Sequence, residues 1–308
     1  MKIAVPDLIS NSYFPAIAAV ELGFFKQEGL NVALELISPT EDTYAALRDG
    51  EIDFVGSSAH SALSAFPEWR GAKLLCAQSQ GMYWFLVMRA ELGVRRGDLS
   101  AVKGRRIGAA PLVGLALRGL LAAAGIDPER DGVEIAPVPG SHGRHVSFGV
   151  TAARALQDGV IDGFWANGMA AEIAVRSGAG TLVLDVRRGD GPAEAFDYTM
   201  PVIAVSEALL EDAPEKAAAA VRAVMKTQAA LRNNPSLASG IGQRLFPPAE
   251  AGYIADLIAR DAPYYTPCIS PTFVQRMMKF AGAAGLSASG EADYDDVVAR
   301  QTRALWQS

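Results

Sequence analysis

The chain has 308 residues, of which 50% are hydrophobic and 20% charged, a composition typical of a folded globular protein with one large or two ordinary domains. No apolar run is long enough to cross a bilayer, so we expect no transmembrane segment. The net charge of −6 argues against a nucleic-acid partner, because phosphate binding requires a basic surface.

Two features of the sequence bear on the compartment in which the protein works. The cysteines, Cys76 and Cys268, are too few for a disulfide scaffold, and whether they pair or stay as packed thiols is left open. The chain enters an apolar run at its second residue, without the basic and apolar regions of a signal peptide. We therefore expect a periplasmic location if a leader has been removed, and a cytoplasmic one otherwise.

The N-terminal part of the chain alternates between strand and helix patterns. A short apolar run at 2–7 predicts a strand, and a helix with a proline in its first turn follows at 15–29. Alternating apolar and polar residues predict a second strand at 30–38. A helix at 40–50, with acidic residues at its start and a glycine at its end, leads to a third strand at 52–58. This order is that of a parallel sheet.

The same order of elements recurs after Lys103. The predicted elements are a strand at 105–110, a loop and helix at 111–125, a strand at 132–140, a helix at 151–159 and a strand at 161–166. The stretches ALRDGEIDF at 46–54 and ALQDGVIDG at 155–163 nearly repeat each other, each joining a helix end to a strand start. Because the flanking elements also recur in order, the sequence predicts two related α/β units.

Two apolar, extended stretches connect the predicted units. Residues 73–92 carry the chain from the first lobe to the second, and residues 198–210 bring it back. The remainder of the chain reads as helices with apolar stripes that face a core. The expected boundaries are 1–88 with 198–308 for lobe I, including the C-terminal helices, 89–197 for lobe II, and crossings near 80–90 and 196–204.

The first unit carries a resemblance to a known family. The stretch FPAIAAVELGFFKQEGLNVALE at 14–35, followed by ALRDGEIDFVGSSAHSAL at 46–63, resembles the substrate-binding proteins of nitrate, sulfonate, taurine and thiamine-pyrimidine ABC importers. These proteins share a domain with the thiamine-pyrimidine synthases of fungi. The most specific parts are Ala19 to Leu30 and Ala46 to Asp53, and the resemblance extends over nearly the whole chain.

The resemblance implies a type II periplasmic binding protein fold. In that fold each of two lobes is a mostly parallel sheet flanked by helices, and the ligand binds in a cleft between them, around which the lobes close. It implies a solute-binding protein that captures a small organic ligand for an ABC importer. The partners implied are the permease and ATPase, and we expect the protein to be a monomer.

The expected ligand contacts lie in a few loops. In open parallel sheets, ligands bind beyond the carboxyl ends of the strands, where helix N-termini present N–H groups. Hydroxyl side chains there suit a polar or anionic group, and an aromatic ring offers a stacking surface. The candidate ligand-binding residues, including two at the first crossing, are Asn11, Ser12, Tyr13, Ser38, Ser57, Ser58, His60, Gln80, Tyr83, Pro111, Leu112, Val113, His142, Trp165 and Asn167.

Each candidate also has a structural interpretation. Asn11 or Ser12 is equally well placed to cap the helix that follows, and the serines after the third strand can begin an ordinary capped helix. A lone histidine such as His60, or a tryptophan such as Trp165, more often packs in a core than contacts a ligand. The sequence leaves these alternatives open.

The loop at 139–148 places His142, Arg144 and His145 close together in the chain. Such a set suits a carboxylate, sulfonate or phosphate group, although a polar surface loop explains it equally well. The two histidines are spaced like metal ligands, but no cysteine or acidic partner lies nearby. We therefore expect no metal ion and no cofactor.

An enzyme on the same scaffold is the alternative function. The related desulfinases carry a catalytic cysteine in the loop after the first strand, and the pyrimidine synthases carry a cysteine-rich motif. The corresponding loop here, LISNSY at 8–13, contains no cysteine, and the chain has neither G-x-S-x-G nor H-E-x-x-H. We therefore expect no catalysis, with a cytoplasmic enzyme or ligand sensor as the alternative.

The candidate loops also suggest a class of solute. Three aromatic residues, Tyr13, Tyr83 and Trp165, stand in or beside loops that carry few charges. A small inorganic oxyanion would need a denser set of donors. The sequence therefore predicts a partly aromatic or apolar solute with one polar or anionic end.

Overall fold

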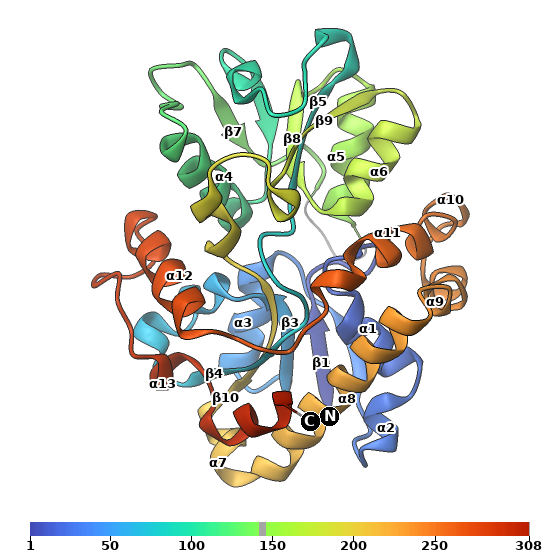
Figure 1. Ribbon diagram of the computed structural model, residues 1–308, viewed down its shortest axis with the longest axis vertical. Coiled ribbons are helices and arrows are strands. Elements are labelled where there is room, and N and C mark those ends of the chain that lie inside the picture. The colour runs from blue at the N-terminus through green and yellow to red at the C-terminus, as the bar shows by residue number, and fades with distance from the viewer. Residues whose placement is uncertain (142–145, 308) are drawn as a thin grey trace. The chain divides into compact units, whose positions relative to one another are not determined.

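The computed structural model describes residues 1–141 and 146–307, and the chain divides into two compact units (Figure 1). Unit 1 comprises Met1–Leu8, Tyr13–Gln80 and Asp197–Ser308, and unit 2 comprises Ile9–Ser12 and Gly81–Phe196. Each unit is built on one five-stranded sheet with helices beside it. The predicted α/β class, with two mostly parallel sheets, is confirmed.

The sheet of unit 1 has the strand order β2-β1-β3-β10-β4. Its strands are β1 (Lys2–Val5), β2 (Ala33–Leu36), β3 (Phe54–Ser58), β4 (Ala72–Ala77) and β10 (Pro201–Ser206). β1 pairs in parallel with β2 and β3, whereas β10 pairs antiparallel with β3 and β4. The three strands predicted in the N-terminal part are therefore confirmed, and β10 joins them from much later in the chain.

The sheet of unit 2 has the matching order β7-β6-β8-β5-β9. Its strands are β5 (Phe85–Arg89), β6 (Arg106–Gly108), β7 (Glu134–Ala136), β8 (Gly163–Ala166) and β9 (Gly180–Asp185). Here β5 is the antiparallel strand, in the place that β10 has in unit 1. The pairing with the edge strand shifts between Ile203 and Ala204 in unit 1, and between Leu86 and Val87 in unit 2. Because these are equivalent positions, the two sheets share even this irregularity.

Helices connect the strands and form most of the last third of the chain (Figure 1). In unit 1 the α-helices are α1 (Phe14–Glu21), α2 (Phe24–Gln27), α3 (Thr40–Arg48), α7 (Glu207–Asp212), α8 (Pro214–Asn233), α9 (Leu237–Leu245), α10 (Pro248–Ala251), α11 (Ile254–Asp261), α12 (Pro271–Ala283) and α13 (Tyr294–Val297). In unit 2 they are α4 (Pro111–Ala123), α5 (Phe148–Gln157) and α6 (Gly168–Arg176). Short 3₁₀ helices are η1 (His60–Ser64), η2 (Pro67–Trp69), η3 (Ala90–Leu92), η4 (Leu99–Val102), η5 (Val186–Arg188), η6 (Ala193–Asp197), η7 (Ala262–Tyr264) and η8 (Arg300–Gln307).

The near-repeat in the sequence is the same turn in both units. Gly50 follows α3 with φ 74°, and Gly159 follows α5 with φ 69°, a left-handed conformation that favours glycine at a helix end. The residue after each glycine donates to a carbonyl five residues back at 2.9 Å, that of Ala46 in one unit and Ala155 in the other. The predicted equivalence of the two stretches is confirmed.

The helix predicted at 15–29 is interrupted, so the prediction of one continuous helix is wrong. α1 ends at Glu21 and α2 begins at Phe24. Between them Gly23 adopts φ 75°, which stops the α-helical hydrogen bonding. The apolar periodicity continues across the break, and this is why the sequence pattern did not reveal it.

The structure divides the chain at Gln80–Gly81 and at Phe196–Asp197. The sequence assigned residues 81–88 to lobe I, whereas the structure places them in unit 2, because β5 pairs with β8 and β9. The Ile9–Ser12 segment, also assigned to lobe I, belongs to unit 2 as well. The expected ligand cleft between the lobes stays a prediction.

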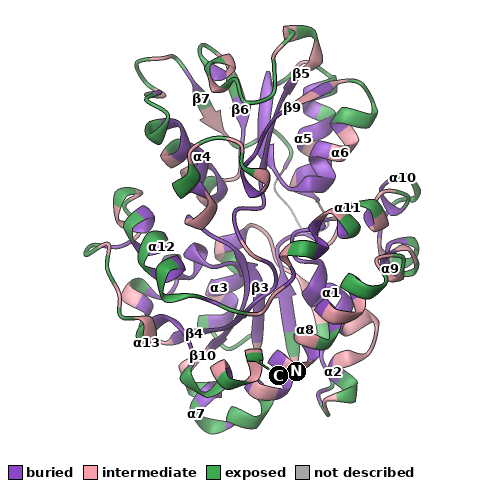
Figure 2. Ribbon diagram, viewed as in Figure 1, coloured by how far each residue is buried: buried purple, intermediate pink, exposed green. Residues whose placement is uncertain are grey.

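Each unit has its own hydrophobic core, seen as buried segments of the sheets and of the helices beside them (Figure 2). In unit 1, Trp69, Leu74 and Met277 are each at most 1% exposed and join η2, β4 and α12. In unit 2, Leu156 of α5 and Phe164 of β8 are at most 1% exposed, among small alanines of α5 and α6. The sheets are therefore rigid supports for the loops at their ends.

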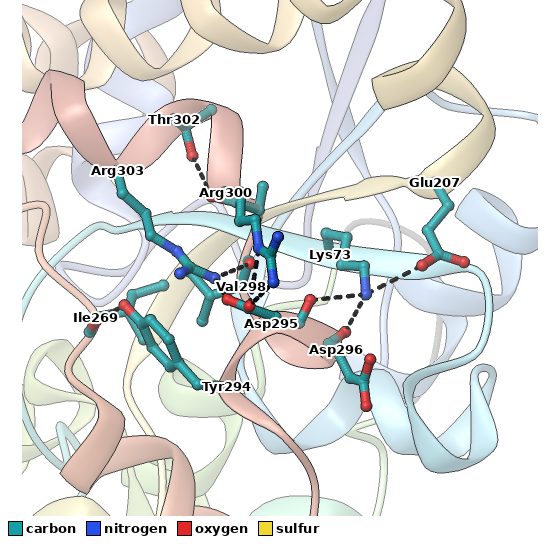
Figure 3. Close-up of polar contacts among 11 residues, drawn as sticks. Lys73, Glu207, Ile269, Tyr294, Asp295, Asp296, Val298, Arg300, Thr302 and Arg303 are labelled. Atoms are coloured by element: carbon teal, nitrogen blue, oxygen red, sulfur yellow. Dashed lines mark hydrogen bonds and ion pairs between the residues drawn. The ribbon is translucent and has the colours of Figure 1, made fainter.

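The C-terminal segment of unit 1 is held against β4 (Figure 3). The Nζ of Lys73 donates to the carbonyls of Asp295 and Asp296 at 3.1 and 2.5 Å, and it pairs with a carboxylate oxygen of Glu207 at 3.1 Å. Val298 also bridges to β4 through its backbone. The end of the chain thus forms part of unit 1.

Candidate functional site

The carboxyl edge of each sheet is the place where several strands end together. In unit 1 it is formed by the ends of β1, β2, β3 and β4 and by the start of β10, because β10 runs antiparallel to its neighbours. In unit 2 the ends of β6, β7, β8 and β9 and the start of β5 form the same kind of edge. Ligands of open α/β sheets bind at such edges.

Buried polar atoms without a partner gather at these two edges. Within the described part of the chain, the buried side-chain polar atoms that make no hydrogen bond include Ser12 Oγ, Ser57 Oγ, Ser141 Oγ, Trp165 Nε1 and Thr199 Oγ1. All five lie at a carboxyl edge. Ser57 and Trp165 lie near the ends of β3 and β8, and Ser12 and Ser141 lie in the loops after β1 and β7. Thr199 lies just before the antiparallel strand β10. Leaving such a group unpaired costs about 1–3 kcal/mol, so each one needs an explanation.

In unit 1, Ser57 and Thr199 each have such a hydroxyl, and both residues are 0% exposed. Ser57 lies in β3 opposite Val202 of β10, and Thr199 stands two residues before the start of that strand. The next serine is different, because Ser58 Oγ lies 2.5 Å from Ser61 Oγ and shares a hydrogen bond with it. Ser57 was predicted as a contact, whereas Thr199 was missed.

His60 lies at the same edge, in an aromatic cluster. It is 0% exposed, and its ring meets Phe280 of α12 edge-on, with ring centroids 5.7 Å apart. The ring of Tyr198 stacks on that of Phe280, with ring centroids 4.6 Å apart. The structural interpretation of His60, that it packs in a core, is therefore supported, and a ligand contact stays a prediction.

Two glutamines at the end of β4 bind the protein's own backbone. The amide of Gln80 donates to the carbonyls of Thr266 and Cys268 at 3.1 and 2.8 Å, so the side chain secures the loop before α12. Gln78, which the sequence reading did not select, is 0% exposed and accepts from the N–H of Ala16 in the first turn of α1 at 3.0 Å. Gln78 thus occupies one of the N–H groups that a ligand at that helix would use.

In unit 2, Trp165 is the most distinctive residue of the carboxyl edge. It is 0% exposed in β8, and its indole N–H has no acceptor among the described residues. Its ring meets Trp84 edge-on at 6.4 Å, and Trp84 in turn lies 4.8 Å from the ring of Tyr83. By the sheet register, Trp165 stands where unit 1 has Gly56. An indole buried without an acceptor is unusual, and it marks this position as a candidate contact.

Asn167 caps the N-terminus of α6. Its Oδ1 accepts from the N–H of Ala170 at 3.0 Å, and it is 8% exposed. A β-carbon added to Gly149 would lie 2.9 Å from both Oδ1 and Nδ2, so the glycine leaves room for this side chain. The capping role accounts for the position of Asn167, and a ligand contact stays a prediction.

The loop after β1 is buried but does not cap α1 through a side chain. Asn11, Ser12 and Tyr13 are 2%, 3% and 4% exposed. The N-cap residue of α1 is Tyr13, which makes no side-chain capping bond. The alternative that Asn11 or Ser12 is the N-cap residue of this helix is therefore wrong.

The remaining candidates are less informative. Ser38 is half-buried, and at the start of α4 Pro111 is exposed, Leu112 is half-buried and Val113 is buried. His142, with Arg144 and His145 of the same loop, lies outside the described residues. Their roles as ligand contacts stay predictions.

Arg187 is a buried residue that the sequence reading missed. It follows β9 at the carboxyl edge of unit 2, is 5% exposed, and donates through Nη2 to the carbonyl of Gly81 at 3.2 Å. The sequence offered one indication of its place: the largely apolar stretch at 180–185 predicts a strand that ends just before Arg187 and Arg188. The guanidinium of Arg187 adds a positive charge at this edge.

Neither cysteine is placed to act as a nucleophile in the loop after β1. Both are free thiols; Cys76 is buried in β4 and Cys268 is exposed. Burial raises the pKa of the Cys76 thiol far above its usual range, which suppresses the reactive thiolate. Within the described ranges, no three His, Cys, Asp or Glu side chains come together as metal ligands would. No helix in the described part of the chain has the length and apolar character needed to span a membrane.

Solved structures share this fold across nearly the whole chain. The alkanesulfonate-binding protein SsuA from Xanthomonas axonopodis pv. citri, bound to MOPS, is 15% identical over 96% of this chain and 97% of that chain, with a TM-score of 0.70. The periplasmic nitrate-binding protein NrtA from Synechocystis PCC 6803 is 14% identical over 99% and 84%, with a TM-score of 0.68. A DszB mutant in complex with biphenyl-2-sulfinic acid is 14% identical over 98% and 97%, with a TM-score of 0.65.

These likenesses show that both units together have the fold of the periplasmic binding proteins. No curated protein matches the chain significantly. A family model described as "NMT1/THI5 like" matches residues 10–238, which is more than half of the chain. The chain therefore belongs to the NMT1/THI5-like family.

Proposed function

We propose that the protein is a solute-binding protein of an ABC importer. It captures a small organic solute with an aromatic or apolar part and one polar end, and presents it to the permease. Family membership supports this proposal, as do the neighbours described as alkanesulfonate-binding and nitrate-binding proteins. We further propose that it acts in the periplasm, as a monomer.

The observation that carries the proposal is the set of unpaired buried polar atoms at the carboxyl edges. Trp165 is the clearest member, because an indole N–H at 0% exposure without an acceptor costs stability. Ser57 in unit 1 and Ser12 in unit 2 add hydroxyls in the same situation. Unpaired buried groups lower the stability of the protein without ligand. These groups lie where this architecture binds ligands, and hydrogen bonds to a bound solute would explain them.

The alternative, an enzyme on the same scaffold, finds support in the DszB neighbour, whose bound molecule is a sulfinic acid. Catalysis of that kind needs a reactive nucleophile near the ligand. Here the buried Cys76 has a raised pKa, and the exposed Cys268 lies in the loop before α12. We therefore propose that the protein binds its solute without converting it.

A thermal-shift screen tests this function. Alkanesulfonates, MOPS, nitrate, aromatic sulfinates and aminopyrimidines are compared at millimolar concentration, because binding to the native state raises the melting temperature. We expect at least one organic solute of this panel to raise it. If none does, the proposed function is contradicted.

Two tryptophan variants test whether Trp165 contributes to solute binding. Trp165→Phe removes the unpaired N–H and is expected to reduce the shift produced by the active solute. Trp69→Phe is the matched control, since Trp69 is 1% exposed and its N–H already donates to the sulfur of Met278 at 3.1 Å. If Trp165→Phe binds as the wild type does, the assignment of Trp165 is wrong.

A further inference from the structure

The two units differ at one equivalent position beside the helix that follows the first strand of each sheet. By the sheet register, Trp165 of β8 stands where Gly56 stands in β3. A β-carbon at Gly56 would lie 3.1 Å from the β-carbon of Ala16, so the first turn of α1 packs directly on this glycine. The position therefore lies against a helix N-terminus, and in unit 2 an indole that is 0% exposed occupies it.

In unit 2, Trp165 lies on the face of the sheet that supports α4. A β-carbon at Gly163 would lie 3.0 Å from Cδ1 of Ile107, so these two paired residues share a face. Trp165 and Ala109 stand two residues further along and lie side by side on that face, because alternate residues of a strand point the same way. A β-carbon at Gly114, in the first turn of α4, would lie 3.5 Å from the β-carbon of Ala109. The indole thus stands beside the first turn of α4.

The first turn of α1 has an acceptor from a side chain of unit 1, and the corresponding residue of unit 2 cannot supply one. Oε1 of Gln78, which directly follows β4, accepts from the N–H of Ala16 at 3.0 Å. By the register, the corresponding residue after β9 is Val186, whose side chain has no polar atom. The N-cap residue of α4 is Ala110, whose side chain cannot accept a hydrogen bond either. The end of α4 therefore lacks the counterpart of the Gln78 amide.

Two hydrogen-bond donors lie at this end of α4. The N–H of Gly114 donates to the carbonyl of Ala110 at 2.7 Å, and the N–H of Val113, one residue earlier, is in a position that has no acceptor within its own helix. The second donor is the indole N–H of Trp165, which is buried and makes no hydrogen bond to the described residues. Because a helix N-terminus carries about half a positive elementary charge, these donors suit a negatively charged acceptor.

The charges of the surrounding segments also favour an anion. The described segments beside this helix end, 109–112, 137–141 and 166–169, contain no aspartate and no glutamate. After β9, Asp185 pairs with Arg188 at 2.9 Å, and the buried Arg187 donates to a backbone carbonyl. An anion at the end of α4 would therefore meet no acidic side chain from these three segments.

We propose that the first turn of α4 and the indole N–H of Trp165 bind the anionic end of the solute, an oxyanion such as a carboxylate, sulfinate or sulfonate. This inference rests on the proposed solute-binding function and names the group that unit 2 selects. In unit 1 the amide of Gln78 holds the corresponding place, so the anionic end binds to unit 2.

Ala110→Asp tests the role of the helix end, because it supplies an internal carboxylate in place of the solute's. Ala110 is half-buried and has extended backbone, and an N-cap aspartate bonds to the N–H groups of the first turn. We expect this variant to melt at a higher temperature than the wild type and to bind organic anions at least about 10-fold more weakly. Ala122→Asp is the control, since it adds the same charge at the exposed far end of α4 and should bind these anions like the wild type.

Two pairs of probes test the charge of the bound group. Benzenesulfonate is compared with benzenesulfonamide, and benzoate with benzamide, because the members of each pair differ mainly in charge. In calorimetric titrations we expect at least one of the two anions to bind about 10-fold more tightly than its neutral amide. Trp165→Phe should weaken the binding of that anion about 10-fold, the cost of one lost hydrogen bond, whereas Trp69→Phe should not.

Three results would overturn the proposal of an anion site at α4. These are neither anion binding more tightly than its amide, Ala110→Asp binding the anion as the wild type does, or Trp165→Phe doing so. The proposed solute-binding function fails separately, and only if no member of the panel in the thermal-shift screen raises the melting temperature.

Discussion

Asp53 and Lys2 are joined by two hydrogen bonds. The N–H of Asp53 donates to the carbonyl of Lys2 at 3.0 Å, and the N–H of Lys2 donates back to Oδ2 of Asp53 at 2.6 Å. Asp162 and Arg106 form the same pair of bonds in unit 2, both at 2.9 Å. The repeated aspartate therefore joins the start of β1 to the turn before β3 in unit 1, and the start of β6 to the turn before β8 in unit 2. This explains why the sequence repeats, and it assigns the repeat to the scaffold.

Removing this carboxylate is expected to destabilise the protein. Asp162 has a side chain that is 12% exposed, and it also pairs with Nη2 of Arg89 at 3.2 Å. We expect Asp162→Ala to lower the free energy of unfolding by about 2–4 kcal/mol, since hydrogen bonds to a charged acceptor are lost. Urea denaturation measures this, with the exposed Asp158→Ala as the control, expected within about 0.5 kcal/mol of the wild type. Equal effects of the two variants would contradict the role of Asp162.

The strand that carries Trp165 begins at a glycine that has no room for a side chain. A β-carbon at Gly163 would lie 2.3 Å from the sulfur of Met88 and 2.9 Å from the carbonyl of Val87. We expect Gly163→Ala to cost about 1–3 kcal/mol of unfolding free energy through overpacking. In contrast, Gly240→Ala in the exposed middle of α9 should stabilise the protein by about 0.5–1 kcal/mol. Thermal denaturation of both variants tests whether Gly163→Ala lowers the stability and Gly240→Ala raises it.

The C-terminal segment gives a prediction about pH. Hydrogen bonds from Arg300 and then Arg303 lower the pKa of Asp295 from 3.8 to about 2 (Figure 3). Because the pKa is depressed in the folded state, the ionised carboxylate contributes stability above pH 3.8 that is lost as the pH falls toward about 2. We expect Asp295→Asn to show a flatter fall of the unfolding free energy over this range.

Salt provides the control for this pH effect. The side chain of Asp295 is 39% exposed, so its ion pairs are screened by solvent and by added salt. The difference between wild type and Asp295→Asn should therefore shrink at about 1 M sodium chloride. Parallel pH profiles for the two proteins at low salt would show that the pairing of Asp295 does not contribute to stability.

Much of the fold could be predicted because it depends on local patterns. The turns at Gly50 and Gly159 follow from helix periodicity that ends on a glycine, and both glycines adopt the left-handed conformation common after a helix. The break at Gly23 was missed because the apolar periodicity continues through it. The assignment of β5 to unit 2 was missed because antiparallel pairing with β8 depends on residues far away in the chain.

The candidate site could also be predicted only in part. Ser57 and Trp165 could be selected because they lie near the carboxyl ends of strands that the sequence reveals. Thr199 could not, because it matters only once β10 is known to run antiparallel beside β3, which brings its start to the carboxyl edge. Gln80 was selected for its place in the chain, yet its amide binds backbone carbonyls that come from a segment almost two hundred residues later. The sequence alone did not reveal contacts between residues that lie far apart in the chain.

The most direct test of the account is a calorimetric titration of the purified protein with the best solute from the thermal-shift screen, followed by recovery of that solute and its analysis by mass spectrometry. Reversible capture predicts one binding event per chain and a solute that is recovered unchanged. The account is contradicted if no solute of the panel produces binding heat, or if the recovered solute has been converted to a product.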